Sequence, residues 1–285
     1  MKKKVLWLLI LIPIFVMAMA IEFVLGYEIY NDLSYGEKAE NIMDVYIPDV
    51  AYDREVNGCI LLIHGGSWSG GDKGDEAMMA RFLANNGYIA ASINYSLSAD
   101  EGYNVGIVLD EIESAFQKLV EFCAEKQIKV DKYATYGYSA GAHLSMLYSF
   151  SCERDISFVA NMAGPAAINF EIWGDHLSVR IAEILSGGEI TEEMIEGDEL
   201  TRLLESYSPA SYVDSDTPPV ILAYGGKDTL VTMENGEALI EKLEDYGVKY
   251  DYVFFPNSDH TLLLDFGQRI KFACLVVDYC NEYFD

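Results

Sequence analysis

Residues 133–144 read Tyr-Ala-Thr-Tyr-Gly-Tyr-Ser-Ala-Gly-Ala-His-Leu, and the five from Gly137 to Gly141 form the pattern G-x-S-x-G. Apolar, β-favouring residues precede this pentapeptide and an apolar helical pattern follows it, so Ser139 is predicted to lie at a sharp turn from strand to helix. Such a turn needs glycines because two backbones approach closely, and it exposes the serine hydroxyl. The pattern also fits a serine that caps an ordinary helix, so it requires support from the rest of the chain.

A second glycine-rich segment precedes the serine. Residues 64–68 read His-Gly-Gly-Ser-Trp and directly follow the apolar run Cys59–Ile63. Backbone N–H groups without a side chain can approach a negatively charged oxygen closely, and loops of this type supply such donors in acyl-transfer enzymes. We therefore expect the N–H groups of Gly65, Gly66 and Ala140 to form an oxyanion hole. A plain glycine-rich turn would not explain why the segment precedes the G-x-S-x-G pattern in this order.

A serine nucleophile requires a general base, and the chain has four histidines. His64 belongs to the glycine-rich segment. His143 follows the serine in the next helix and is expected to point into its packing, while His176 lies in a separate stretch. His260 remains, in a loop between the last predicted strand and the last predicted helix. We predict that His260 is the base.

A carboxylate must orient the imidazole of that base. Asp228 follows the apolar run Val220–Tyr224 through Gly-Gly-Lys, which places it in the loop beyond a strand and before His260. The order serine, aspartate, histidine is one that such hydrolytic triads use. We predict Asp228 as the third member, although the chain has 46 acidic residues and other carboxylates compete. The rivals outside this loop position are Asp214, Asp216, Glu234 and Asp259.

Apolar, β-favouring runs alternate with longer helical patterns, which is typical of a mostly parallel, twisted α/β sheet with helices on both faces. The expected strands are Asn41–Ile47, Cys59–Ile63, Tyr88–Tyr95, Tyr133–Gly137, Phe158–Ala163, Val220–Tyr224 and Tyr250–Phe255. The expected helices are Glu76–Asn86, Val105–Lys126, Ala140–Phe150, Met233–Tyr246 and Leu262–Tyr283.

The stretch from about residue 165 to 216 breaks this alternation. It contains helical patterns at Leu177–Leu185 and Glu192–Glu205 and ends before Pro218-Pro219. Insertions in α/β folds lie over the carboxyl ends of the strands, where ligands bind. The stretch is therefore interpreted as a cap or lid, with a purely structural excursion as the alternative. Trp68 is expected to contribute to the substrate pocket together with it.

The chain begins with Met-Lys-Lys-Lys, followed by a 17-residue apolar run from Val5 to Ile21 that contains Ala18-Met19-Ala20 near its end. A basic start, an apolar centre and a small-x-small end are typical of a secretory signal peptide, here residues 1–20. The same run could instead be an uncleaved membrane anchor reaching about residue 26. Both interpretations predict export, secreted or held at the outer face of the cytoplasmic membrane, and leave 27–285 as the catalytic domain.

The formal net charge of −27 disfavours nucleic acid as a partner, because an acidic surface repels phosphate. The five cysteines lack C-x-x-C spacing and indicate neither a metal site nor a disulfide framework. Any contact with a membrane is expected only through the N-terminal segment. The oligomeric state cannot be predicted from these features.

With these motifs in place, the chain resembles the α/β-hydrolase esterases, and among them the bacterial feruloyl and acetyl-xylan esterases related to the hormone-sensitive-lipase-like enzymes. The resemblance implies hydrolysis of carboxylic esters with no metal and no organic cofactor. Two positions depart from the family pattern, namely Ser67 in place of a third glycine and Tyr138 in place of a charged residue or histidine. The matching segments are residues 44–48, 65–72, 94–97 and 137–144.

The sequence thus predicts a serine esterase with a Ser139-His260-Asp228 triad that acts on a small or carbohydrate-linked acyl ester. A peptidase or amidase of the same fold is an alternative, because the same triad can cleave amides. A binding module that keeps the fold but lacks turnover is another, since fold does not determine function.

Overall fold

The computed structural model describes residues 26–52 and 58–284. The predicted leader, residues 1–20 or an anchor reaching about residue 26, lies almost entirely outside this part of the chain and stays a prediction. Within residues 26–52 and 58–284, no helix is long and apolar enough to cross a membrane.

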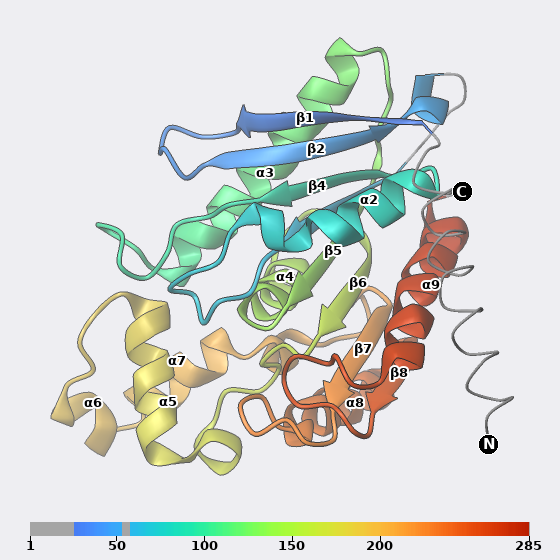
Figure 1. The fold of residues 1–285 in the computed structure, drawn as a ribbon. Helices are drawn as coiled ribbons and strands as arrows, with labels where there is room; N and C mark the ends of the chain where they lie inside the picture. The colour runs from blue at the N-terminus through green and yellow to red at the C-terminus, as the bar shows by residue number, and fades with distance from the viewer. Residues whose placement is uncertain (1–25, 53–57, 285) are drawn as a thin grey trace, which may run out of the picture.

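A single sheet of eight strands forms the centre of the molecule, in the order β1-β2-β4-β3-β5-β6-β7-β8 (Figure 1). Strand β2 pairs antiparallel with β1 and with β4. All the other neighbouring strands of the sheet pair parallel. The mostly parallel sheet predicted above is confirmed. The strands are β1 (Tyr27–Ser34), β2 (Ile42–Pro48), β3 (Gly58–Ile63), β4 (Ile89–Ile93), β5 (Lys132–Tyr138), β6 (Ile156–Met162), β7 (Val220–Gly225) and β8 (Tyr250–Phe255).

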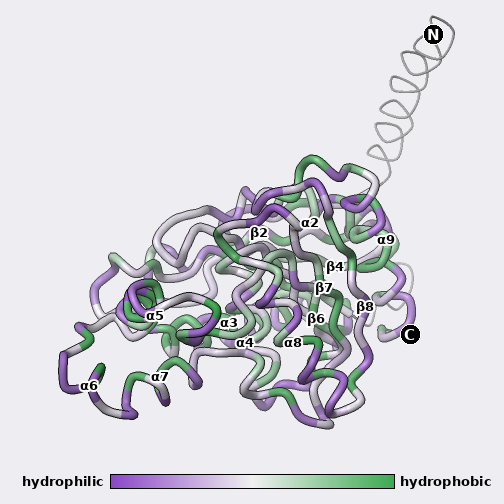
Figure 2. The backbone as a smooth tube through the Cα atoms, turned by 90° about the horizontal axis from the view of Figure 1, so that it is seen from below, coloured by the Kyte–Doolittle hydropathy of each residue, from purple (hydrophilic) through white to green (hydrophobic). Residues whose placement is uncertain are grey.

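Helices cover both faces of the sheet because successive residues of a buried strand point to opposite sides. Along β3, Leu61 and Ile63 join one core with α3, α4 and α8, while Ile60 and Leu62 join the other core with α2 and α9. Hydrophobic segments gather around the sheet and hydrophilic ones along the outer loops (Figure 2). These helices are α2 (Ala77–Asn85), α3 (Val105–Glu125), α4 (Ala140–Ser151), α8 (Met233–Tyr246) and α9 (Phe266–Tyr283).

Within the described residues, the other α-helices lie in the stretch interpreted as a cap, namely α5 (Phe170–Ser186), α6 (Glu192–Glu196) and α7 (Glu199–Tyr207). They form a group beside the main body, on the side toward which β5 and β6 run (Figure 1). The short helix η3 (Pro209–Tyr212) leads back from this group, and Ala210 N donates to Ala166 O at 2.9 Å, so the two ends of the stretch meet.

Two glycines divide the helices of this stretch, and the sequence pattern did not predict either break. The pattern over Glu192–Glu205 forms two helices, because Gly197 is extended (φ −102°, ψ −178°) and ends α6. The helix expected at Leu177–Leu185 lies in the second part of α5, after a kink at Gly174 (φ 68°, ψ 165°). The short first part begins at Phe170, where the Asn169 side chain accepts from Ile172 N and caps it. A helical periodicity alone reveals neither a break nor a cap.

Other boundaries differ at the two ends of the domain. Strand β1 was not predicted because it is an edge strand with several exposed positions and a register shift between Tyr30 and Leu33, so its alternation is weak. The last helix begins at Phe266 and not at Leu262, because Leu262 has a left-handed backbone (φ 54°). The four residues before the helix therefore stay in the loop that carries His260.

Candidate active site

The turn at Ser139 has the conformation predicted from its glycines. Ser139 has φ 54° and ψ −121°, between the end of β5 and the start of α4, and its N–H donates to Met162 O at 2.8 Å. A Cβ on Gly137 would lie 2.3 Å from the backbone of Gly141, and one on Gly141 would lie 2.0 Å from Ile63 O. Larger residues would therefore separate α4 from the ends of β5 and β3, and the serine would lose its position.

Three side chains that are distant in the sequence meet at this turn. The Nε2 atom of His260 lies 2.8 Å from Ser139 Oγ, and its Nδ1 atom lies 2.7 Å from Asp228 Oδ2. The side chain of Asp228 is fully buried, and its second oxygen accepts from the N–H groups of Leu230 and Val231 at 2.8 and 2.9 Å. The carboxylate is thereby fixed in one orientation, with one oxygen left for the imidazole.

The loop that carries His260 is fastened to the loop that carries Asp228. Lys227 N donates to Ser258 O at 3.0 Å, and the buried Ser258 donates through Oγ to Asp265 Oδ2 at 2.8 Å. The imidazole is therefore held by backbone contacts as well as by its carboxylate partner. Such preorganisation is what a general base within hydrogen-bond reach of a nucleophile requires.

Tyr138 is a residue whose part in the site the sequence did not reveal. Its hydroxyl donates to His260 O at 2.8 Å, and its ring lies 5.5 Å from the imidazole, centroid to centroid. Burial, with the nearby Asp228 charge, raises the pKa of Tyr138 to about 12, so the hydroxyl stays protonated and remains a donor at neutral pH. Tyr138 therefore supports the position of the base from the strand side.

We expect Tyr138→Phe to lower kcat about fivefold, because one neutral hydrogen bond contributes about 1 kcal/mol and a factor of ten corresponds to about 1.4 kcal/mol. The measurement is steady-state hydrolysis of a p-nitrophenyl ester. Tyr136→Phe is the matched control, since the Tyr136 hydroxyl contacts Met162 Sδ and the Glu76 side chain but no member of the triad. Equal kcat values for the two variants would refute a supporting role for Tyr138.

The glycine-rich loop leaves the end of β3 directly beside the turn at Ser139, because Ile63 pairs with Gly137 in the sheet. A Cβ on Gly65 would lie 3.2 Å from Ser139 Cβ, and Gly66 O accepts from Ser69 N and Gly70 N in a tight turn. Ala140 is the first residue of α4, where N–H groups have no partner within the helix. Gly65 and Ala140 thus lie next to the serine, and Gly66 follows in the same loop. The role of their N–H groups as an oxyanion hole stays a prediction.

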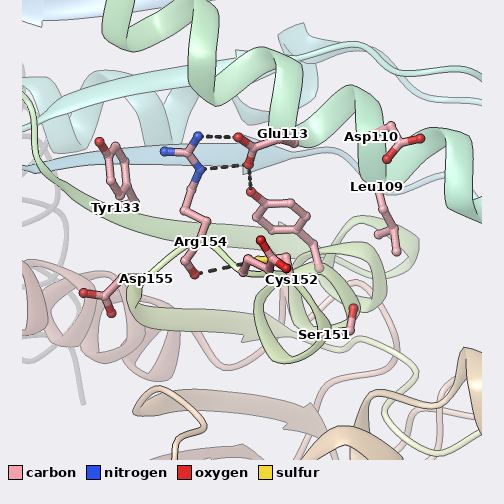
Figure 3. A pocket seen from close by; sticks show the side chains of 10 residues that line it. Leu109, Asp110, Glu113, Tyr133, Ser151, Cys152, Arg154 and Asp155 are labelled. Carbon is pink, nitrogen blue, oxygen red and sulfur yellow. Dashed lines mark hydrogen bonds and ion pairs between the residues drawn. The ribbon is translucent and has the colours of Figure 1, made fainter.

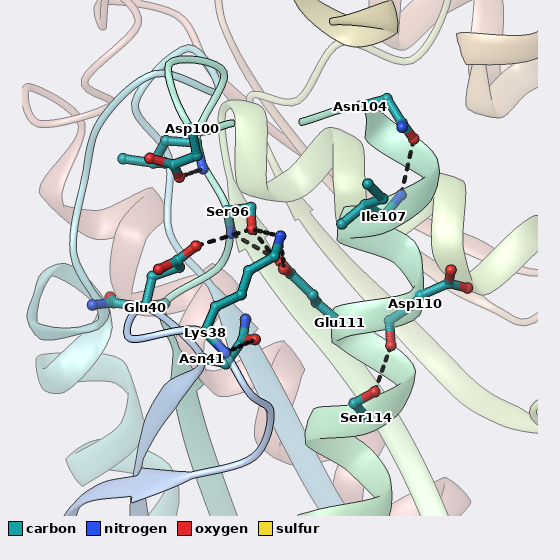
Figure 4. Close-up of polar contacts among 12 residues, drawn as sticks. Lys38, Glu40, Asn41, Ser96, Asp100, Asn104, Ile107, Asp110, Glu111 and Ser114 are labelled. Atoms are coloured by element: carbon teal, nitrogen blue, oxygen red, sulfur yellow. Dashed lines mark hydrogen bonds and ion pairs between the residues drawn. The ribbon is translucent and has the colours of Figure 1, made fainter. Parts of the chain in front are cut away.

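A hydrogen-bond network of mostly buried side chains connects the glycine-rich loop to the segment after β4 and to α3. Tyr95 donates to His64 O at 2.9 Å, and its ring stacks on the imidazole of His64 at 4.4 Å. The next residue, Ser96, donates to Glu111 of α3 through N–H at 2.8 Å and through Oγ at 2.6 Å, and Lys38 completes the cluster at 2.9 Å from Glu111 (Figure 4). The segment after β4 is therefore anchored to α3, and the glycine-rich loop is anchored to that segment.

The other histidines lie where the elimination placed them. His176 is exposed on α5. His143 is fully buried and contacts Trp68, a residue that is itself only 5% exposed. Trp68 thus faces the packing of α4, and its expected contribution to a substrate pocket stays a prediction.

A hollow of about 640 Å³ lies away from the triad, near the far end of α4 (Figure 3). Its lining includes a closed ion pair, in which Arg154 contacts both carboxylate oxygens of Glu113, and Tyr148 donates to the same carboxylate at 2.5 Å. The guanidinium of Arg154 lowers the pKa of Glu113 to about 2. These groups satisfy one another, so we assign the hollow no part in the chemistry.

A model of the BD-FAE family matches residues 43–243, which span most of the sheet and include Ser139 and Asp228. The chain belongs to the BD-FAE family. The resemblance to feruloyl-esterase-like α/β hydrolases is thereby confirmed. His260 lies beyond the match, and its place in the site rests on the hydrogen bonds described above.

Esterases are among the proteins similar to this BD-FAE member. Esterase LipQ from Mycobacterium tuberculosis is 26% identical over 81% of the chain and 56% of its own length. The fold is similar to a truncated carbohydrate esterase from gut microbiota (TM-score 0.73, 16% identity, 90% of this chain and 96% of that one). It is also similar to an inhibited esterase B from Lactobacillus rhamnosis (TM-score 0.71, 18% identity, 90% and 87%). The chain spans a little over half the length of the curated relatives LipQ and LipM.

Proposed function

We propose that this chain is a serine carboxylesterase that hydrolyses a small or carbohydrate-linked acyl ester. The observation that carries the proposal is the continuous chain of hydrogen bonds from Ser139 Oγ through His260 to the buried carboxylate of Asp228, at 2.8 and 2.7 Å. Membership in the BD-FAE family supports it. The side chains that acyl transfer requires are a nucleophile, a base and an acid that orients the base. We propose Ser139, His260 and Asp228 for these three roles.

In the first step, Ser139 Oγ attacks the carbonyl carbon of the ester while His260 Nε2 accepts the hydroxyl proton. The carbonyl π electrons move to oxygen, and the N–H groups of Gly65, Gly66 and Ala140 stabilise this oxyanion. The tetrahedral intermediate collapses, the bond to the alcohol oxygen breaks, and His260 gives its proton to the departing alcohol. The product is an acyl-serine.

In the second step, water attacks the acyl carbon and passes a proton to His260 Nε2. A second tetrahedral intermediate forms with the same oxyanion donors. It releases the carboxylic acid, and the proton returns from His260 to Ser139 Oγ. Asp228 stays ionised throughout, keeps Nδ1 of His260 protonated and stabilises the imidazolium that forms in each step.

The substrate class is an inference from family and location. The BD-FAE family and the likeness to a carbohydrate esterase support an acyl group carried by a sugar or polysaccharide. The basic and apolar start of the chain supports export, so the ester would be met outside the cytoplasm, with the domain either free or held by its N-terminal segment. Helices α5 to α7 are proposed to act as the cap that restricts the acyl group.

A fluorophosphonate probe tests the proposal directly, because it forms a stable bond only with an activated serine. We expect the purified full-length chain to be labelled in minutes, the adduct to map to Ser139 by mass spectrometry, and p-nitrophenyl acetate to be hydrolysed. Ser145→Ala is the matched control, since Ser145 is buried on the same helix and is not part of the triad. That variant should be labelled like the wild type.

Other outcomes would point to the alternatives. A well-folded chain that is neither labelled nor active on any acyl length would favour a binding module with no turnover. Labelling together with faster cleavage of amides than of esters would favour a peptidase or amidase. A probe adduct on a residue other than Ser139 would contradict the assigned nucleophile.

A further inference from the structure

His143 connects three segments that surround the candidate site. It lies on α4, one turn after Ser139, and is fully buried. The indole Nε1 of Trp68, in the glycine-rich loop, lies 3.2 Å from His143 Nδ1, and the two rings meet edge to face at 5.3 Å. On the other side, His143 Nε2 lies 2.8 Å from the carbonyl oxygen of Tyr207, the last residue of α7.

The partners determine the protonation of His143. An indole N–H can only donate and a backbone carbonyl can only accept, so Nδ1 of His143 must be the acceptor and Nε2 must carry the proton. The ring is therefore neutral and makes one hydrogen bond on each side. Burial lowers the pKa of His143 to about 4, which is consistent with a neutral ring across the ordinary pH range.

The Trp68 side of this connection holds a strained loop. Ser67 and Trp68 have left-handed backbones, with φ of 52° and 57°. Each such residue costs about 1–2 kcal/mol, so the loop keeps this conformation only if its surroundings hold it. Two contacts do so at Trp68, the indole bond to His143 and the bond from Ser98 N to Trp68 O at 2.8 Å. The two glycines expected to stabilise the oxyanion directly precede these residues.

The Tyr207 side of the connection holds the proposed cap. The final carbonyls of a helix have no partner within the helix, and Tyr207 O is one of them. His143 Nε2 donates a hydrogen bond to this carbonyl oxygen. The next residue, Ser208, is buried and accepts from Ile168 N at 2.7 Å through Oγ. The base of the cap is thus tied both to its own first segment and to the helix that begins at the nucleophile.

We propose that His143 is a positioning residue that couples the cap to the oxyanion loop, holding the loop through Trp68 and the cap through Tyr207. The inference rests on the proposed esterase function, because its consequence is catalytic. Through its hydrogen bond with Trp68, His143 fixes the positions of the N–H groups that stabilise the oxyanion, and these positions determine kcat. The side that faces Tyr207 sets the position of the cap and thereby KM and the preferred acyl length.

Two substitutions separate the two sides. In His143→Asn the amide oxygen can stand in the place of Nδ1 and accept from Trp68, but the side chain is too short to reach Tyr207 O. In His143→Gln the amide nitrogen can stand in the place of Nε2 and donate to Tyr207 O, while the acceptor for Trp68 is lost. Trp68→Phe removes the same hydrogen bond from the other partner and keeps an aromatic ring.

We expect His143→Gln to lower kcat on p-nitrophenyl acetate roughly tenfold with KM nearly unchanged, since a misplacement of about 1 Å can cost as much as a hundredfold. Trp68→Phe should lower kcat by a similar factor. We expect His143→Asn to keep kcat and to raise KM or shift the acyl-length profile. Ser145→Ala, on the same helix as His143, is the control and should change neither, because the Ser145 hydroxyl is buried without a hydrogen-bond partner.

Nuclear magnetic resonance gives a readout that does not depend on turnover. The indole N–H signal of Trp68, identified by its absence in Trp68→Phe, should shift strongly in His143→Gln and little in His143→Asn. Thermal unfolding of each variant separates a loss of positioning from a loss of fold, because a purely structural role predicts kcat losses that follow stability in all three variants.

The outcomes are distinguishable. A wild-type chain that is neither labelled nor active refutes the proposed function and with it the catalytic consequence of His143. An active wild type with equal kcat losses in His143→Asn and His143→Gln, or an unshifted indole signal in His143→Gln, overturns the coupling alone. The opposite kinetic effects of the two variants, with the indole shift in one of them, establish it.

Discussion

Ser139→Ala and Ser139→Gly are expected to lower ester hydrolysis by about 10⁴ to 10⁶-fold, because the residual rate then comes only from binding and the oxyanion donors. The two variants should differ in stability. Ser139 has φ 54° and ψ −121°, a conformation that costs a residue with a Cβ about 1–3 kcal/mol. Glycine avoids this cost and loses only about 0.5–1 kcal/mol in unfolded-state entropy, so Ser139→Gly should be about 1 kcal/mol more stable than Ser139→Ala.

Chemical denaturation of the two inactive variants measures this difference, and hydrolysis of p-nitrophenyl acetate measures the loss. Ser145→Ala again serves as the control, since its hydroxyl is buried without a hydrogen-bond partner and its removal should leave both quantities close to wild type. A Ser139→Ala variant with full activity would remove the nucleophile from the mechanism. A Ser139→Gly variant that is less stable than Ser139→Ala would show that the turn stores no strain.

Asp228→Asn is expected to lower kcat by about 10⁴-fold. Asp228 uses one oxygen for Leu230 N and Val231 N and the other for His260 Nδ1. Asparagine has a single oxygen, which the two backbone N–H groups would retain, so its NH₂ group would face the imidazole. Nδ1 of His260 would then become an acceptor, Nε2 would carry the proton, and the imidazole could not accept the proton of Ser139.

The neighbouring acid provides the control. Asp259 precedes His260 in the chain but is exposed, and its carboxylate accepts from Thr261 N and Thr261 Oγ1. We expect Asp259→Asn to keep kcat within about twofold, since surface substitutions change little. Steady-state kinetics on both variants decides between the two acids. A larger loss in Asp259→Asn than in Asp228→Asn would mean that the orienting acid was assigned wrongly.

Much of the site could be predicted because its parts are local. A strand, a tight turn and a helix leave a periodic pattern and a pair of glycines in neighbouring positions, so Ser139 and the loop at Gly65 and Gly66 could be proposed from the sequence. His260 followed by elimination among four histidines. Asp228 followed from its place after a strand, because the carboxyl ends of parallel strands meet at one edge of the sheet.

The tertiary structure decided what depends on contacts between distant segments. Tyr138 and His143 are local parts of the G-x-S-x-G region, yet their partners are His260 O in one case and Trp68 and Tyr207 O in the other. No periodicity encodes such pairs. The break at Gly197 does carry a local signal, since a glycine inside a helical pattern weakens the helix, but periodicity alone passed over it. Strand β1 was missed because an edge strand with several exposed positions shows a weak alternation. The sequence by itself therefore determined the fold class and the candidate triad, and only the tertiary structure decided which residues hold that triad in place.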